Sequence, residues 1–265
     1  MRIMTIASGS SGNCIYVGSD NTHILIDAGV SRKKIIEGLK KADISAADIS
    51  AVFVTHEHAD HIKGLGVLSR KDAIPVYCTK GTADGIVCAR SLGEIPKDII
   101  HEIKSDSDVH INDLTIHTFK ISHDANEPVA YTVSDSRKKF GIATDLGYYD
   151  DYIVRNLTGC DSLLIEANHD VNLLQVGSYP YYLKQRILGE KGHLSNEVSG
   201  QLINCLLHDN IKAITLGHLS KENNYDKLAY ETVRTEIDMS DNIYKAKDFD
   251  IEVAKRDEPS RIISI

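Results

Sequence analysis

The stretch Phe53-Val-Thr-His-Glu-His-Ala-Asp-His61 decides how this sequence is interpreted. An apolar strand expected over 51–54 runs directly into three histidines and an aspartate. In extended chain, His56 and His58 are two residues apart and point to the same side, so both imidazoles can reach one cation. Asp60 and His61 fall after the bend, where a helix is expected to begin, and can serve a neighbouring cation. The spacing therefore predicts two metal ions.

Asp60 taken alone has a simpler interpretation. An aspartate just ahead of a helix is typical of an N-cap residue, here for a helix from Ile62. Four ligating side chains behind one buried strand are rarely structural, so the metal interpretation is preferred for the set.

Composition places the chain among globular proteins. Hydrophobic residues make up 42% of the 265 residues and charged residues 26%, which excludes disordered and collagen-like classes. The net charge of -8 predicts no general affinity for phosphate backbones, so any nucleic-acid contact must be local. No apolar run reaches the roughly 18 residues of a membrane span, and five scattered cysteines indicate reduced thiols. We expect a cytoplasmic protein with no membrane partner; the sequence leaves the oligomeric state open.

The pattern of apolar residues predicts an α/β fold. Before residue 100, strands are expected over 2–6, 14–17, 23–26, 51–54 and 76–78, with helices after Ser31, over 62–68 and over 81–91. After it, strands are expected over 109–111, 114–121, 129–133, 139–143, 162–166 and 213–216, with helices near 149–157, 182–189, 196–207 and 226–236. Two sheet-plus-helix halves would form a four-layer αββα sandwich, a single domain over 1–265.

His56-x-His58-x-Asp60-His61 resembles the signature of the metallo-β-lactamase superfamily, whose fold is that sandwich. Other elements of the family pattern follow apolar strands, with Asp27 expected as a structural residue. The resemblance implies that one metal is held by His56, His58 and His123, the other by Asp60, His61 and His218, and that Asp145 bridges them. Without this context, a hydrogen-bonded loop residue and a metal ligand are equally good interpretations of His123 and of His218.

The ligand set contains only nitrogen and oxygen, which admits Zn²⁺, Mn²⁺ or Fe. Two such cations about 3.5–4 Å apart can lower the pKa of a bridging water toward ~7 and neutralise a phosphoryl transition state. The residues therefore predict hydrolysis of a phosphoester or ester, with Asp60 orienting the hydroxide.

Flanking motifs supply candidates for substrate contact. The loop that ends Ser11-Gly12-Asn13 can offer backbone N–H groups to an anion, although an ordinary hairpin turn fits it as well. Gly192-His193-Leu-Ser195 resembles a motif of tRNase Z-like nucleases, which implies that His193 is the general acid; packing beside a Ser195 cap is the other interpretation. The candidate substrate-binding residues are Ser11, Gly12, Asn13, Asn168, His169 and Ser220.

Taken together, these motifs resemble the YycJ family, also called WalJ or VicX, over nearly the whole chain. That resemblance implies a bacterial cytoplasmic 5′-to-3′ DNA exonuclease linked to DNA repair. Two other functions stay open: a small-molecule hydrolase acting on a thioester or cyclic phosphodiester, and a non-catalytic metal-binding regulatory partner.

Three short cationic segments are candidates for local contact with a nucleic acid. Arg32–Lys34 and Arg137–Lys139 read best as solvated faces. Lys184 and Arg186 follow the tyrosine-rich stretch Tyr179–Tyr182, where stacking on bases and a plain solvated face are equally good interpretations.

Overall fold

The computed structural model describes the backbone of residues 1–265 and every side chain except that of Lys97. The chain forms two compact units that alternate along the sequence. Unit 1 comprises Met1–Lys120, Ala125–Arg137 and Lys255–Ile265, and unit 2 comprises Ile121–Asp124 and Lys138–Ala254. The last eleven residues, Lys255–Ile265, therefore return to unit 1 after the chain has passed through unit 2.

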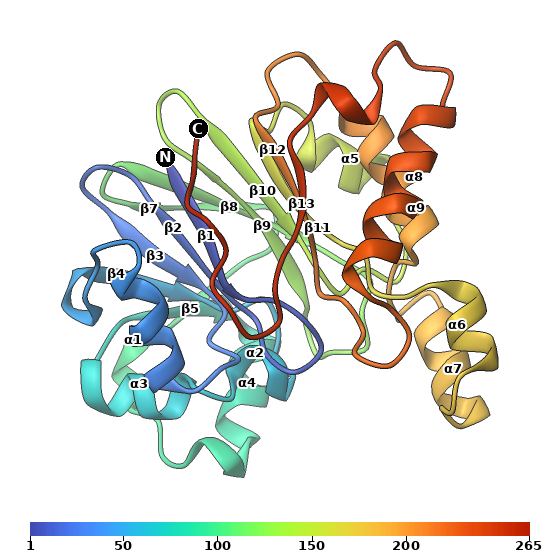
Figure 1. Ribbon diagram of the computed structural model, residues 1–265. Helices are drawn as coiled ribbons and strands as arrows, with labels where there is room; N and C mark the ends of the chain where they lie inside the picture. The colour runs from blue at the N-terminus through green and yellow to red at the C-terminus, as the bar shows by residue number, and fades with distance from the viewer. The chain divides into compact units, whose positions relative to one another are not determined.

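Unit 1 contains a seven-stranded mixed sheet in the order β14-β1-β2-β3-β4-β5-β6 (Figure 1). The strands are β1 (Arg2–Ala7), β2 (Cys14–Gly18), β3 (His23–Ile26), β4 (Ile49–Phe53), β5 (Val76–Thr79), β6 (Ile100–Ile103) and β14 (Ile263–Ser264). Pairing is antiparallel from β14 to β3 and parallel from β3 to β6. Because parallel strands end at the same edge of a sheet, residues that follow β3 and β4 lie close together.

The helices of unit 1 pack on this sheet through apolar faces. They are α1 (Arg32–Lys40), α2 (Ala59–Ile62), α3 (Leu65–Asp72) and α4 (Lys80–Cys88), with short 3₁₀ turns η1 (Ala46–Asp48), η2 (Arg90–Leu92) and η3 (Lys97–Ile99). Ile35 and Leu39 of α1 share a buried core with Met4 and Ile6 of β1. Burial of each such side chain contributes roughly 1.5–3 kcal/mol, which fixes α1 against the sheet.

Unit 1 also holds an antiparallel ladder of β7 (Ser107–Ile111), β8 (Leu114–Lys120) and β9 (Val129–Ser134). The ladder supports the end of β4. Tyr131 on β9 donates its hydroxyl hydrogen bond to the Val54 carbonyl at 2.7 Å, and the Val129 N–H donates to the Thr55 carbonyl at 3.0 Å. Two hydrogen bonds from β9 thereby hold the backbone that leads into His56.

Unit 2 is built on four parallel strands, β10 (Lys139–Ala143), β11 (Ser162–Glu166), β12 (Ala213–Gly217) and β13 (Ile251–Val253). Every residue of β11 and β12 is buried, which explains their continuous apolar sequence. The helices are α5 (Asp151–Leu157), α6 (Val171–Val176), α7 (Tyr181–Leu188), α8 (Asn196–Leu206) and α9 (Asp226–Met239), with the 3₁₀ turn η4 (Ala246–Asp248). In Figure 1, α8 and α9 lie side by side beside these strands.

Three strand ends carry a residue in the left-handed backbone region. Asp27 follows β3 with φ 61°, Asp145 follows β10 with φ 62°, and His218 follows β12 with φ 55°. Non-glycine residues in this region typically cost about 1–3 kcal/mol each and concentrate at functional sites. All three belong to the motifs that the sequence singled out.

Several elements differ from the sequence prediction. The helix expected over 62–68 is divided into α2 and α3, because the chain bends at Gly64, where an added Cβ would lie 1.9 Å from the Val30 carbonyl oxygen. The strand β6 and the helix α6 were not predicted, since both are short and neither has a clear apolar period. Among the described residues, no helix is long and apolar enough to span a membrane.

Gly29 follows β3 and lies close to the backbone of the histidine motif. Its replacement tests this close approach. A Cβ added at Gly29 would lie 1.7 Å from the Asp60 carbonyl oxygen. We therefore expect Gly29→Ala to lower the free energy of unfolding by about 2 kcal/mol or more, measured as the midpoint of denaturant unfolding. Gly189→Ala is the matched control, because its nearest neighbour lies at 3.1 Å and its expected loss is below about 1 kcal/mol. Equal midpoints for the two variants would contradict the close approach.

Candidate metal centre

The histidine motif lies at the end of β4 in unit 1, where the chain turns into α2. His56 and His61 are fully buried, and their ring centroids lie 4.1 Å apart. His58 occupies the N-cap position of α2 without a side-chain capping bond, and Asp60 lies within the first turn. The simpler interpretation of Asp60 as an N-cap is therefore wrong, because the helix starts at Ala59, three residues earlier than the sequence suggested, and His58 takes the N-cap position.

Asp27 fixes the orientation of His61. The Nδ1 of His61 donates to Asp27 Oδ2 at 2.7 Å, and an ionised carboxylate only accepts hydrogen bonds. The neutral imidazole then carries its lone pair on Nε2, which lies 3.5 Å from Asp60 Oδ2. Asp27 has the structural position that the sequence suggested for it.

Thr55 extends this support to His56. Its hydroxyl lies 3.0 Å from Asp27 Oδ2 and 3.0 Å from His56 Nδ1. The Thr55 N–H also donates to Asp27 Oδ1 at 2.8 Å. One buried carboxylate thus organises the Nδ1 side of two histidines, a pattern common in the outer shell of metal sites.

Asn13, a predicted substrate-binding residue, lies against the same motif. Its Oδ1 accepts from the Gly9 N–H at 2.9 Å, so its amide nitrogen is the group that lies 3.2 Å from His61 Nε2 and 3.4 Å from Asp60 Oδ2. Its backbone N–H donates to the Asp60 carbonyl at 2.8 Å. Asn13 therefore positions Asp60 and supports the assignment of Nε2 as an acceptor.

Unit 2 brings a second set of ligand-type side chains together. Nitrogen or oxygen atoms of Asp145, Glu166, His193 and His218 all lie within 4.8 Å of one another. His218 Nε2 lies 3.5 Å from Asp145 Oδ1, and His123 Nε2 lies 3.6 Å from the same oxygen. The Nδ1 of His123 is directed at the Gly192 carbonyl at 3.2 Å. The two predicted histidine ligands of this unit, His123 and His218, thus converge on the carboxylate of the third, Asp145.

Glu166 is the residue that sequence reasoning missed. It is fully buried at the end of β11, and its Oε1 accepts from the Nδ1 of His193 at 2.7 Å and of His218 at 3.0 Å. Its Oε2 accepts from the backbone N–H groups of Leu146 at 2.9 Å and Leu194 at 3.3 Å. A glutamate that closes an otherwise apolar strand is a usable signal, because a buried carboxylate needs partners.

The Glu166–His193 pair shifts the pKa of both groups. Burial alone would lower the pKa of His193, but the neighbouring carboxylate of Glu166, with its hydrogen bond, holds it above the ordinary value. Burial would raise the pKa of Glu166, and the charges and hydrogen bonds of His193 and His218 instead bring it below the ordinary value. The pair therefore favours a protonated His193 beside an ionised Glu166.

The remaining predicted substrate contacts are mostly buried. Of the six, only Ser11 is exposed. Asn168 donates through its amide to the His218 carbonyl at 2.9 Å, and the Ser220 N–H donates to the Asn168 carbonyl at 2.7 Å. These two residues brace the His218 loop.

His169 differs from the other buried candidates. Among the described residues, its Nε2 has no hydrogen-bond partner, and its Nδ1 lies 3.3 Å from Asn168 Oδ1. Burial lowers the pKa of His169 to about 4, so it is neutral at physiological pH.

The cationic segment at Lys184 and Arg186 has a structural role. Lys184 Nζ donates to the carbonyls of Gln175 and Gly177 at 2.7 Å each, at the end of α6. Arg186 forms an ion pair with Asp124, next to His123. Both cations therefore brace unit 2, whereas Tyr181 and Tyr182 stay exposed on α7.

Comparison with known proteins identifies the family. The sequence model of the β-lactamase superfamily domain matches residues 22–214. The chain is 40% identical over 238 residues to exodeoxyribonuclease YycJ of Bacillus anthracis, with 88% of each chain covered. It is also 40% identical over 236 residues to exodeoxyribonuclease WalJ of Streptococcus pneumoniae, covering 89% of this chain and 88% of that relative. The chain belongs to the β-lactamase superfamily and, within it, to the YycJ/WalJ family.

A solved structure confirms the predicted fold class of this YycJ/WalJ family member. The metallo-β-lactamase fold protein YhfI of Bacillus subtilis superposes with a TM-score of 0.70 at 16% sequence identity, with 98% of both chains covered. At that identity the likeness concerns the fold alone. The αββα class predicted from the alternation of strands and helices is therefore correct, and the His/Asp cluster has the composition of a divalent-metal site.

Glu166 gives a direct test of how the histidines are held. In Glu166→Gln one Nδ1–H or backbone N–H would face an amide NH₂ instead of an acceptor, so we expect affinity for Zn²⁺ or Mn²⁺ to fall by about 10–100-fold. Titration calorimetry measures the affinity, and circular dichroism checks that the fold is kept. The exposed Glu222 supplies the control Glu222→Gln, for which no change is expected. An unchanged affinity in Glu166→Gln would contradict the orienting role.

Proposed function

We propose that this chain is a nuclease that hydrolyses DNA from the 5′ end with the help of two divalent cations. The observation that carries the proposal is the 40% identity, over 88% of the chain, to a relative named as an exodeoxyribonuclease. The two sets of histidines and carboxylates agree with it, because metal-assisted hydrolysis needs nitrogen and oxygen ligands. Cytoplasmic location and a role in DNA repair stay predictions.

The residues fit two metal ions, with Zn²⁺ or Mn²⁺ preferred and Fe permitted by the ligand chemistry. In this proposal His56, His58 and His123 would hold one ion, Asp60, His61 and His218 would hold the other, and Asp145 would serve both. The support is that Nδ1 of His61 and of His218 faces a buried carboxylate, which directs Nε2 to the opposite side of each ring. When bound, such ions lower the pKa of a water molecule and neutralise charge on the phosphoryl group.

Asp60 and Asp145 take different roles in this scheme. The side chain of Asp60 is 24% exposed, and that of Asp145 is 2% exposed. A partly solvated carboxylate can accept a proton from the attacking water and orient it, whereas a buried one serves as a fixed ligand. Asp60 is therefore the residue that positions the nucleophile.

His193 supplies the proton to the leaving oxygen. Its Nδ1 is engaged with Glu166, which leaves Nε2 as the nitrogen that transfers the proton, and its side chain is 18% exposed. Although burial lowers the pKa of His193, the charge and hydrogen bond of Glu166 raise it above the ordinary value, which extends the acid form toward higher pH. At alkaline pH, where His193 has lost this proton, it should no longer protonate the leaving oxygen, and the rate of DNA hydrolysis should fall.

The activity is tested with end-labelled DNA. Wild-type protein with Mn²⁺ or Zn²⁺ should shorten single- or double-stranded DNA from the 5′ end, and His58→Ala should reduce the rate by more than about 100-fold, since a metal ligand is lost. His110→Ala is the control, because His110 is exposed on β7 and bonds Thr115. Gel analysis of 5′- and 3′-labelled strands reads out the rate and the polarity.

The same assay separates the alternatives. RNA and a thioester or cyclic phosphodiester are run beside DNA under identical metal conditions. Turnover of a small ester with intact DNA would establish the small-molecule hydrolase instead. Binding of metal without turnover of any of these substrates would favour the non-catalytic regulatory protein.

The role of His193 as general acid is tested by comparing substrates whose leaving groups differ in their need for a proton. His193→Ala should slow DNA hydrolysis by about 10²–10⁴-fold, because the departing alkoxide needs a proton. Hydrolysis of a p-nitrophenyl phosphodiester should be slowed far less, because p-nitrophenolate leaves without one. The alkaline fall in the wild-type pH–rate profile on DNA should be absent in the variant. Equal losses on both substrates would show that His193 does not act as the acid.

A further inference from the structure

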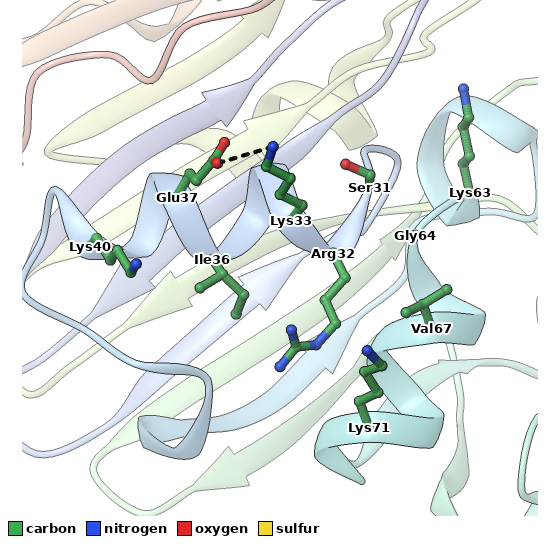
Figure 2. A pocket seen from close by; sticks show the side chains of 10 residues that line it. All are labelled: Ser31, Arg32, Lys33, Ile36, Glu37, Lys40, Lys63, Gly64, Val67 and Lys71. Atoms are coloured by element: carbon green, nitrogen blue, oxygen red, sulfur yellow. Dashed lines mark ion pairs between the residues drawn. The ribbon is translucent and has the colours of Figure 1, made fainter.

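A cationic hollow lies between α1 and α3 in unit 1, outside the set of metal-ligand residues (Figure 2). Its volume is about 500 Å³. Its walls carry five cationic side chains, Arg32, Lys33, Lys40, Lys63 and Lys71. We call it the α1–α3 groove.

Two of these cations are already paired. Arg32 forms two hydrogen bonds of 2.6 Å with Asp72, so its charge is compensated. Lys33 lies 3.8 Å from Glu37, but both side chains are well exposed, and such a pair contributes little. Among the described residues that line the groove, Glu37 is the only acidic one.

The other three cations carry the surplus charge. In the part of the chain that the structure describes, Lys40, Lys63 and Lys71 form no ion pair, and all three are exposed. They come from three different segments, the end of α1, the turn after α2 and the last turn of α3. In a chain with a net charge of -8, this local excess of positive charge is complementary to an anionic ligand.

The floor of the groove limits the kind of anion. Ile36 of α1 and Val67 of α3 face the groove, and Val67 is 41% exposed. Separated cations above apolar side chains fit a ligand whose phosphates are spaced by groups with apolar faces. The sugar–phosphate chain of a nucleic acid has that composition.

The groove begins beside the proposed catalytic residues of the same unit. Lys63 follows His61 by two residues, and the Gly64 N–H donates to the Ala28 carbonyl at 2.7 Å. The Ala28 N–H in turn donates to the His61 carbonyl at 2.8 Å. One end of the groove is thus built from the two backbone segments that hold Asp60 and His61.

We propose that the α1–α3 groove binds the phosphodiester backbone of the nucleic-acid substrate, several nucleotides away from the bond that is cleaved. This inference rests on the proposed nuclease function, because it assigns a second contact to the same substrate. It gives an acidic protein a local means of holding a polyanion.

Salt dependence of binding is the measurable signature. Each phosphate contact contributes about 0.7 to 0.9 to the slope of log K against log salt. In the variant K40Q/K63Q/K71Q the slope should therefore be less steep by about 2–3. The variant should also bind a fluorescent 20-nucleotide strand about 10-fold or more weakly than wild type. Anisotropy is measured on the full chain without added metal, so that the strand stays intact.

A second triple variant controls for the change in net charge. Lys104, Lys212 and Lys227 are exposed and lie outside the groove, and K104Q/K212Q/K227Q removes the same three charges. Its slope should stay close to that of wild type. The variant K40R/K63R/K71R should bind the strand as wild type does, because it keeps the three positive charges.

Three outcomes overturn the inference. Equal losses in the two glutamine variants would mean that net charge alone acts. An unchanged slope in K40Q/K63Q/K71Q would mean that the groove does not contact phosphates. Failure of the wild-type protein to bind DNA or RNA at low salt would exclude the groove as a nucleic-acid site.

Hydrolysis assays distinguish a failure of the groove from a failure of the nuclease proposal. In K40Q/K71Q, kcat/KM should fall about 10-fold for a 20-nucleotide strand and stay unchanged for bis(p-nitrophenyl) phosphate, which is too small to reach the groove. Wild-type hydrolysis of the strand with no loss in K40Q/K71Q refutes the groove and leaves the nuclease function standing. Binding through the groove without hydrolysis of any phosphodiester refutes the nuclease function and leaves the groove standing.

Discussion

The candidate site depends on one repeated constraint, the engagement of histidine Nδ1 by a fixed acceptor. In unit 1 the acceptor is Asp27, which takes the Nδ1–H of His61 at 2.7 Å. In unit 2 it is Glu166, which takes that of His218 at 3.0 Å. An imidazole held in this way keeps one tautomer and presents Nε2 as the ligand nitrogen. The two units use the same device with carboxylates from different strands.

This constraint explains why the surrounding backbone is strained. Asp27, Asp145 and His218 each follow a parallel strand and each adopt positive φ. Positive φ turns the backbone away from the strand direction immediately after the strand. The side chain of the turning residue therefore lies at the end of the strand. Left-handed backbone is unfavourable by about 1–3 kcal/mol per residue, and the buried strands on which these residues stand supply the stability that maintains it. The close contact of Gly29 with the Asp60 carbonyl belongs to the same tight junction.

Sequence reasoning recovered the elements that carry a strong local signal. The strands β1 to β4 and β8 to β12 match the prediction to within two residues, because apolar residues run through them or alternate along them between polar turns. The motif around His56 and the αββα class followed from them. The division between α2 and α3 was missed, because it depends on a contact between Gly64 and the distant Val30, which no local pattern encodes.

The supporting residues were harder to predict than the ligands. Glu166 bonds side chains 27 and 52 positions away, and nothing beside it in the sequence indicates these partners. Lys184 and Arg186 were candidate nucleic-acid contacts because a tyrosine-rich stretch precedes them, yet their charges are used within unit 2. The surplus charge between α1 and α3 became visible only when Lys63 and Lys71 were placed opposite Lys40. Whether a cationic side chain can bind a ligand depends on whether a carboxylate or carbonyl already pairs with it. These partners are known only from the folded chain.

The most direct test of this account is the tautomeric state of the histidines. Long-range ¹H–¹⁵N correlation spectra of ¹⁵N-histidine-labelled protein distinguish a protonated Nδ1 from a protonated Nε2. We expect His61, His123 and His218 to be Nδ1–H tautomers before Zn²⁺ is added, and titration with Zn²⁺ to shift their Nε2 signals while Nδ1 stays protonated. Nε2–H tautomers, or metal-dependent loss of the Nδ1 proton, would contradict it.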